Sequence, residues 1–329
     1  MSSVKRDQIV ASNSSKSIIK MTKNNVSMIF PNCAQFYSSC QLQNFSLSDC
    51  IIFYVSKNPS TPEFYQKLIQ SCKHFFIKNP IIVIDFLDFV CINGYKTMAN
   101  GNCIELSNIY SKLWITKLLN VQTPENIFLS NISKFYSKCD IRYLYLYDQT
   151  LNFYGLKMIA KKCEKVVFDN VAVINNGNSV VTLEKIVGVL PNIQKFKYDF
   201  RGNANFIMKF ETVAELIQLQ NFLNVTRFEL RNIPVTFDVS TFYNHIKKNQ
   251  TAEYHLHFGY VISVDEIPED EIEGGIPDIE INVEYKTRLQ KIVDEILETE
   301  NRDYKVPIIE FDGQDGTAYI NLVNLFQQK

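Results

Sequence analysis

One pair of residues in this chain of 329 residues has the spacing of metal ligands: His255 and His257. Residues two apart in a strand lie on the same face, so two imidazoles at this spacing could chelate one metal ion. Tyr254, Leu256 and Phe258 would occupy the other face of that strand. No carboxylate or third histidine is placed to complete a set of ligands. We therefore expect no metal site, and interpret both histidines as solvent-facing.

Motifs that bind phosphate or activate a nucleophile are absent from the sequence. It contains no G-x-S-x-G, no P-loop, no G-x-G-x-x-G and no H-E-x-x-H. The eight cysteines include no C-x-x-C pair, and most have apolar neighbours, which is typical of small buried side chains in a reducing compartment. We therefore expect no catalytic residue and no cofactor, and do not expect the chain to be an enzyme.

Composition and charge restrict the classes of partner. Lysine and arginine total 34 against 35 acidic residues, a net charge of −1 that predicts no binding to nucleic acid or to an anionic membrane. No stretch reaches the ~18 apolar residues of a spanning helix. The best candidate, 81–92, is interrupted by Asp85 and Asp88 and predicts a buried strand or another core segment. With no signal peptide at the N-terminus, an intracellular location, cytoplasmic or nuclear, is expected.

A short helical unit over 41–80 follows a polar segment, 1–40, that is expected to be a disordered tail. The first helix, around 50–55, is apolar all round, and such a helix must be covered on more than one side. Ser60-Thr61-Pro62-Glu63 predicts a capping box with Ser60 as the cap. A second helix is then expected, whose apolar stripe consists of Phe64, Leu68, Ile69, Cys72, Phe75 and Phe76.

From residue 141 onward the chain repeats one pattern, apolar-x-x-apolar-x-apolar. Its copies are Ile141/Leu144/Leu146, Cys163/Val166/Phe168, Ile193/Phe196/Tyr198, Val225/Phe228/Leu230, Thr251/Tyr254/Leu256 and Val306/Ile309/Phe311. A strand motif repeated with helical segments between the copies is typical of a leucine-rich-repeat-like solenoid. We therefore predict an α/β region over 141–329 whose strands lie side by side in one parallel sheet, in chain order. A doubly wound α/β domain is the alternative fold.

The helical segments between the copies have recognisable caps and stripes. Thr182 and Asp238 are each expected to cap a helix, and a further helix is predicted from Tyr285 to Leu297 by apolar residues at offsets 0, 4, 7, 8, 11 and 12. Residues 81–140 are expected to link the helical unit to the repeats. We interpret the acidic stretch 265–284 as an insertion. It could be a solvated loop or a docking arm for a basic partner.

The helical unit resembles an F-box. Leu47-Ser48-Asp49 stands where an F-box begins with Leu-Pro, and 68–75, Leu-Ile-Gln-Ser-Cys-Lys-His-Phe, matches its closing signature. An F-box followed by leucine-rich-type repeats is the arrangement of substrate receptors in Skp–cullin ubiquitin ligases. The resemblance implies docking to a Skp-type adaptor, with a cullin in the same complex, through the apolar residues Leu47, Ile51, Ile52, Val55, Leu68, Ile69, Cys72 and Phe75.

The resemblance also implies that the repeats hold a target protein for ubiquitin transfer. The protein would then accelerate modification by proximity alone. An alternative remains, in which the chain is a repeat-based interaction scaffold with a degenerate F-box and no role in ubiquitin transfer. The repeats differ from the leucine-rich consensus at the ninth position, where an asparagine ladder is expected. The residues found there are Gln149, Val171, Arg201, Ile233 and Gly259.

Overall fold

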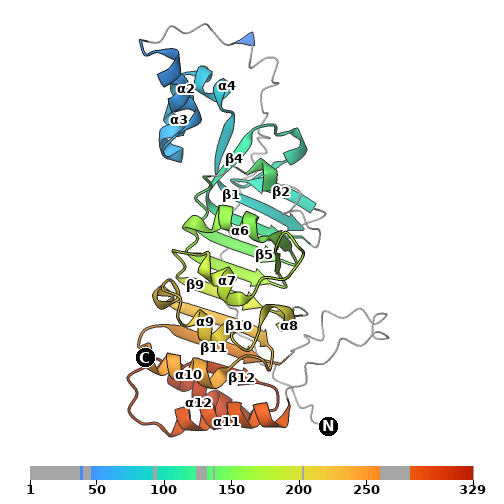
Figure 1. Cartoon of the computed structure of the whole chain (residues 1–329), viewed down its shortest axis with the longest axis vertical. Coiled ribbons are helices and arrows are strands. Elements are labelled where there is room, and N and C mark those ends of the chain that lie inside the picture. Colours follow the sequence, from blue (N-terminus) through green and yellow to red (C-terminus); the bar gives the residue numbers. More distant parts are fainter. Residues whose placement is uncertain are drawn as a thin grey trace, which may run out of the picture.

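A ten-stranded, largely parallel β-sheet forms the frame of the computed structural model (Figure 1). The structure describes residues 38–39, 46–91, 95–123, 132–135, 138–201, 204–259 and 282–328. The strands of the sheet are β1 (Ile81–Cys91), β2 (Tyr95–Ala99), β3 (Asn102–Ile104), β4 (Lys112–Gln122), β5 (Tyr143–Tyr147), β7 (Lys165–Asp169), β9 (Lys195–Asp199), β10 (Arg227–Ile233), β11 (Glu253–Phe258) and β12 (Ile308–Phe311). A separate pair, β6 (Thr150–Asn152) and β8 (Ala172–Ile174), is also parallel.

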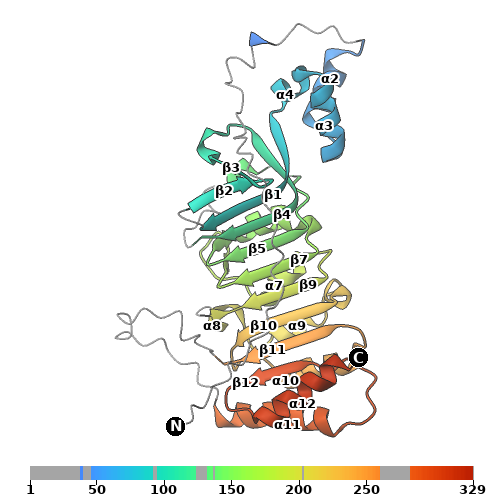
Figure 2. The ribbon, with the colours of Figure 1, turned by 180° about the vertical axis from the view of Figure 1, so that it is seen from behind.

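From β4 to β12 the strands lie side by side in chain order, and every neighbouring pair is parallel. The order predicted from the six sequence copies is therefore confirmed. Figure 2 shows one face of the sheet, over which no described helix lies from β5 to β10. Because a doubly wound domain has helices on both faces of its sheet, this arrangement contradicts that alternative.

The helices between the strands cover the other face. They are α6 (Phe153–Ile159), α7 (Leu183–Gly188), α8 (Ala204–Ile207), α9 (Thr212–Leu216), α10 (Val239–Lys248) and α11 (Val283–Glu298), with short 3₁₀ turns at Ala160–Lys162 and Phe222–Asn224. Asp238 caps α10 as predicted, its carboxylate accepting from the Thr241 amide at 3.0 Å. The helix predicted from Tyr285 is confirmed as α11, which buries Leu289, Val293 and Ile296.

Period-two alternation divides each strand between the core and the uncovered face. In β5, Leu144 and Leu146 are fully buried, whereas Tyr145 and Tyr147 alternate with them on the uncovered face. The buried positions of successive strands stack, as in the aromatic pair Phe196 and Phe228, whose ring centroids lie 5.5 Å apart. The residues of the repeated apolar pattern thus form the side of the sheet that faces the core.

Gln149 stands at the ninth position of the first repeat, where an asparagine ladder would begin, and it is buried. Its side-chain amide donates to the Thr123 carbonyl oxygen at 2.6 Å, joining the turns that follow β4 and β5. The preceding residue, Asp148, has a φ of 51°, a conformation that short polar side chains tolerate better than most. A longer amide therefore connects neighbouring turns where asparagine was expected.

The helical unit consists of α2 (Asp49–Lys57), α3 (Pro62–Ser71) and α4 (Lys73–Lys78). The single helix predicted across 64–76 is wrong, because Cys72 is extended (φ −157°, ψ 129°) and divides it into α3 and α4. The cap is also one residue later than predicted. Thr61, rather than Ser60, accepts from the Phe64 amide at 3.1 Å, because Pro62 occupies the first helical position after it.

Residues 81–123 continue the sheet beyond the repeats. The strand predicted over 81–92 is confirmed as β1, which pairs with β4 in parallel and with β2 in antiparallel orientation. The antiparallel strands β2 and β3 were not predicted. The segment 1–37 and most of the acidic stretch, 265–281, lie outside the described residues. Within the described part of the chain, no helix is long and apolar enough to cross a bilayer.

Candidate protein-binding surfaces

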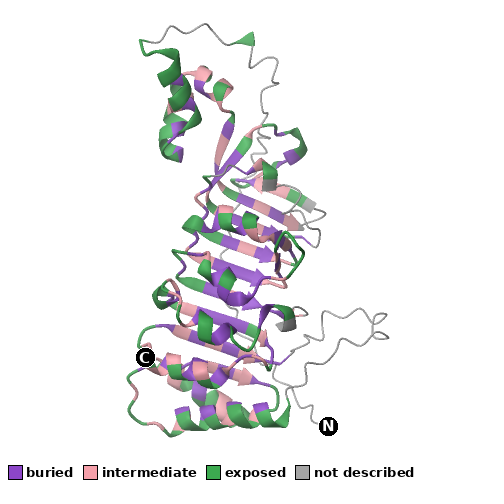
Figure 3. Cartoon of the chain, in the orientation of Figure 1, coloured by how far each residue is buried: buried purple, intermediate pink, exposed green. Residues whose placement is uncertain are grey.

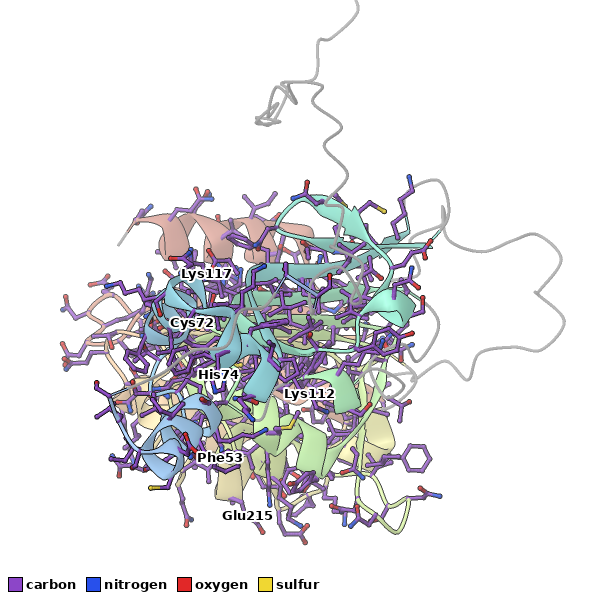
Figure 4. All side chains as sticks on the ribbon, turned by 90° about the horizontal axis from the view of Figure 1, so that it is seen from above. Phe53, Cys72, His74, Lys112, Lys117 and Glu215 are labelled. Atoms are coloured by element: carbon purple, nitrogen blue, oxygen red, sulfur yellow. The ribbon has the colours of Figure 1, made fainter. Side chains whose placement is uncertain are left out.

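The first candidate surface is an apolar patch on α2. Leu47, Ile51, Phe53 and Tyr54, here called the α2 surface, are 52%, 46%, 55% and 67% exposed. Only Ile52 and Ser56 of this helix are buried, although the helix is apolar nearly all round. Figure 3 shows most of α2 in the colour of exposed residues, and Figure 4 views the unit end-on with Phe53 labelled. The expected cover on more than one side is therefore not supplied by the described residues.

The eight residues expected to bind an adaptor separate into three groups. Leu47 and Ile51 are exposed, and Ile52 and Phe75 are buried within the chain. The half-buried members are Val55, Leu68, Ile69 and Cys72. The structure thus brings only part of the predicted set to the surface. It adds Phe53, Tyr54 and Phe64, which are exposed and were not in that set.

Tyr65 attaches the helical unit to the sheet and was missed by the sequence argument. Its ring is fully buried against Trp114 of β4, with 6.4 Å between ring centroids, and Ile69 packs against the same cluster. The Tyr65 hydroxyl donates to the Asn79 carbonyl and accepts from the Ile81 amide at 3.2 Å. These contacts place α3 against the start of β1, while α2 keeps an exposed face.

The second candidate surface is a hollow of about 620 Å³ on the uncovered face of the sheet, here called the cationic hollow. Lys165, Lys195 and Arg227 occupy equivalent register positions on β7, β9 and β10, and form a row across three adjacent strands. Lys197 lines the hollow as a fourth cation, and Glu229 is its single carboxylate. Tyr145 and Tyr147 of β5 line its other side.

Glu229 is the centre of a charge network within this hollow. Its carboxylate lies 3.1 Å from the Lys197 ammonium, 2.9 Å from Arg231 and 3.3 Å from Arg227. Burial raises the pKa of Glu229, but the hydrogen bond and charge of Lys197, together with Arg231, more than offset this and hold the pKa below its ordinary value. Glu229 is therefore ionised at neutral pH, and its negative charge is balanced by these neighbouring cations.

Lys165 and Lys195 differ from the other cations of the hollow. Within the described chain neither side chain has a carboxylate within 4 Å. The Lys165 ammonium lies over the Tyr145 ring, 5.2 Å from its centroid. The hollow consequently presents two uncompensated positive charges beside two aromatic rings.

The sequence carries a signal for this row that the motif argument did not use. The residue just before the middle anchor is Lys165, Lys195 and Arg227 in three successive copies. In one parallel sheet these equivalent positions become neighbours about 4.8 Å apart. A cation recurring at one position of a repeat thus predicts a charged row, provided that the repeats are known to stack.

The histidine pair lies at the far end of the same face. The interpretation of both side chains as solvent-facing is wrong in part, because His255 and His257 are half-buried. The His255 ring packs edge-on against Phe326 of α12 (Gly316–Gln327), with 5.0 Å between centroids. Burial, the larger cause, lowers the pKa of both histidines below the ordinary value. In the described part of the chain, no three His, Cys, Asp or Glu side chains gather as metal ligands.

Comparison with known proteins adds no relative. No protein-family model matches the chain. No curated protein matches it significantly.

Proposed function

We propose that this protein is the substrate-recognition subunit of a Skp–cullin ubiquitin ligase, with an F-box-like unit over 41–80 and a leucine-rich-repeat-like solenoid over 141–329. In this proposal the helical unit docks on a Skp-type adaptor, and the sheet holds the target. The chain itself forms and breaks no bonds, and acts by placing its target near a ubiquitin-loaded enzyme. The proposed location is the cytoplasm or the nucleus.

The α2 surface is the observation that carries the proposal. Four large apolar side chains remain exposed at the end of the sheet: Ile51, Phe53 and Tyr54 on α2, and Leu47 just before its cap. Several large apolar side chains exposed on one short segment are typical of a site that a partner covers. The Lys57 ammonium lies 5.9 Å from the centroid of the Phe53 ring, so a basic group borders these apolar side chains.

The support for a solenoid is the arrangement of the sheet. Six copies of one strand motif lie in chain order, with helices on one face and an uncovered face on the other. Each strand and helix completes its core against the next pair along the chain, which is how repeat proteins are stabilised. The uncovered face is then a long surface suited to holding a target.

Co-purification of the adaptor tests the proposal. The variant Leu47→Asp with Ile51→Asp should abolish capture of a Skp-type adaptor and cullin, because burying a charge at an apolar anchor costs several kcal/mol. Such a loss removes a complex of micromolar affinity. The matched control is Leu223→Asp with Ile320→Asp, two exposed apolar residues outside the helical unit, and it should capture the adaptor like the wild type.

Two outcomes would contradict the proposal. In one, the wild-type protein captures no Skp-type adaptor from a lysate in which known F-box proteins do so. In the other, the α2 variant captures it as well as the control variant does. Cooperative thermal unfolding of both variants, followed by far-UV circular dichroism, excludes misfolding as the cause of a loss.

The interaction scaffold without a ubiquitin role is the second candidate. It is favoured by Ile52, Phe75 and Ile69, which the F-box resemblance assigns to the adaptor but which the structure uses for internal packing. In that case the helical unit closes the end of the sheet. The same capture experiment separates the two candidates, since a scaffold retains other partners when the adaptor is absent.

A further inference from the structure

The cationic hollow has a chemistry that specifies its partner more closely than the proposed function does. It combines the row Lys165, Lys195 and Arg227 with the rings of Tyr145 and Tyr147 on adjacent strands of an uncovered face. We propose that this hollow binds an extended acidic segment of a partner protein. Under the proposed function that partner is the ubiquitination target, and to that extent the inference rests on it.

Charge complementarity is the first argument. Lys165 and Lys195 have no carboxylate partner among the described residues, whereas Glu229, the carboxylate of the hollow, is matched by Lys197 and Arg231. An incoming carboxylate would therefore pair with a free ammonium and displace no existing ion pair. Lys195 is exposed and Lys165 is half-buried, so both ammonium groups are accessible from solvent.

The spacing of the row fits an extended peptide that crosses the strands. Neighbouring strands lie about 4.8 Å apart, so the three cations span roughly 10 Å. Side chains on one face of an extended peptide repeat every ~6.6 to 7 Å. Two acidic residues at alternate positions therefore lie within reach of the row, and the intervening residue faces away from it.

The tyrosines supply the apolar part of the site. Tyr145 and Tyr147 are half-buried, and tyrosine is enriched where protein surfaces meet because it offers a large, rigid contact area. Val167 lies between Tyr145 and Lys197 in the register and lines the floor of the hollow. An acidic segment with an apolar or aromatic residue beside its carboxylates would contact both the cations and the tyrosines of the hollow.

The opposite rim of the same face favours a peptide over a nucleic acid. Asp169 and Asp199 are register neighbours, two positions along β7 and β9 from Val167 and Lys197. The Asp169 carboxylate is paired with Arg201 at 2.9 Å, and the chain has no net positive charge to attract a phosphate backbone. A short acidic segment along the cationic row stays clear of both carboxylates.

Fluorescence anisotropy of the full-length protein with labelled probes tests this inference without any adaptor. The probes are a decapeptide of alternating Glu and Ser containing one Phe, its Lys/Ser counterpart, and a single-stranded oligonucleotide of the same net charge as the acidic peptide. We expect binding of the acidic peptide alone, weakening as salt is raised because exposed charges are screened.

Charge reversal in the row provides the decisive comparison. Lys165→Glu with Lys195→Glu should weaken binding of the acidic peptide at least tenfold, about 1.4 kcal/mol. The matched control is Lys161→Glu with Lys185→Glu, which makes the same change of net charge at two exposed lysines outside the hollow. This control should bind within twofold of the wild type.

Three results would overturn the inference: equal losses in the two variants, tighter binding of the oligonucleotide than of the acidic peptide, or no binding of the acidic peptide. Capture of the adaptor by the row variant is measured in parallel. If the wild-type protein captures the adaptor but does not bind the acidic peptide, only this inference is overturned. If the α2 variant still captures the adaptor while acidic-peptide binding is intact, only the role of the α2 surface is overturned.

Discussion

At the residue scale, single polar side chains decide how separate parts of the chain are joined. Tyr65 is the clearest case, because its buried side chain donates one hydrogen bond to the Asn79 carbonyl and accepts another from the buried Ile81 amide. The Asn79 side chain in turn donates to the Ser56 carbonyl at 2.8 Å, which ties the end of α4 to α2. The helical unit therefore depends on a short chain of buried hydrogen bonds.

We predict that Tyr65→Phe lowers the free energy of unfolding by about 1–3 kcal/mol, because it leaves the buried Ile81 amide and the half-buried Asn79 carbonyl without this partner. Urea unfolding followed by circular dichroism measures the change. The control is Tyr54→Phe, which removes a hydroxyl from a side chain that is 67% exposed. Equal stabilities of the two variants would contradict this role of the Tyr65 hydroxyl.

At the element scale, each strand of the repeats has two sets of side chains, one on each face of the sheet, with different roles. The positions that match the apolar motif face the helices, and the alternate positions form the rows of the uncovered face. β7, β9 and β10 use the same alternate position for a cation, whereas β5 uses it for Tyr143. One period-two pattern thereby provides both the core and a candidate binding surface.

α12 is the element that ends the uncovered face. It packs on α11 and β12, and places Phe326 against His255 of β11. Leu322 is its fully buried residue, and Ile320, two residues earlier, is 59% exposed. The helix therefore covers the end of the otherwise uncovered face, beside β11 and β12.

We predict that Leu322→Ala lowers the free energy of unfolding by roughly 2–5 kcal/mol, since it removes a fully buried side chain and leaves a cavity. Ile320→Ala, in the same helix, should change it by less than about 0.5 kcal/mol. Chemical denaturation of both variants, followed by circular dichroism, gives the comparison. A small effect of Leu322→Ala would mean that α12 is not part of the folded core.

At the scale of the whole molecule, one continuous core runs along the sheet. A single cluster of buried apolar residues extends from Ile84 in β1 to Leu322 in α12. A smaller cluster of Tyr65, Ile81 and Trp114 joins the helical unit to that sheet. In such an array each strand and its helix are stabilised by contacts with the next strand and helix along the sheet. The two ends are therefore coupled through the repeats between them.

The single tryptophan makes this coupling measurable. Trp114 is buried at the end of the sheet nearest the helical unit, whereas Leu322 lies at the other end. If the core unfolds as one unit, Leu322→Ala should shift the urea midpoint of Trp114 fluorescence by as much as that of circular dichroism. An unchanged fluorescence midpoint would show that the ends unfold independently.

The sequence alone was sufficient for those features that depend on residues near one another in the chain. The strand copies, their chain order, the α10 cap at Asp238 and most of α11 followed from period, spacing and capping chemistry. These features are local because hydrogen bonding within a helix and alternation along a strand involve neighbouring residues. The apolar character of the α2 segment was equally visible, although its exposure was not.

Tertiary structure decided everything that depends on distant contacts. The buried site of Tyr65 arises where the helical unit meets Trp114, about fifty residues away. The cationic row exists only because stacking brings together lysines and an arginine that lie some thirty residues apart in sequence. α12 reaches His255 in the same way. A side chain's exposure is set by what packs against it, and local sequence does not encode that partner.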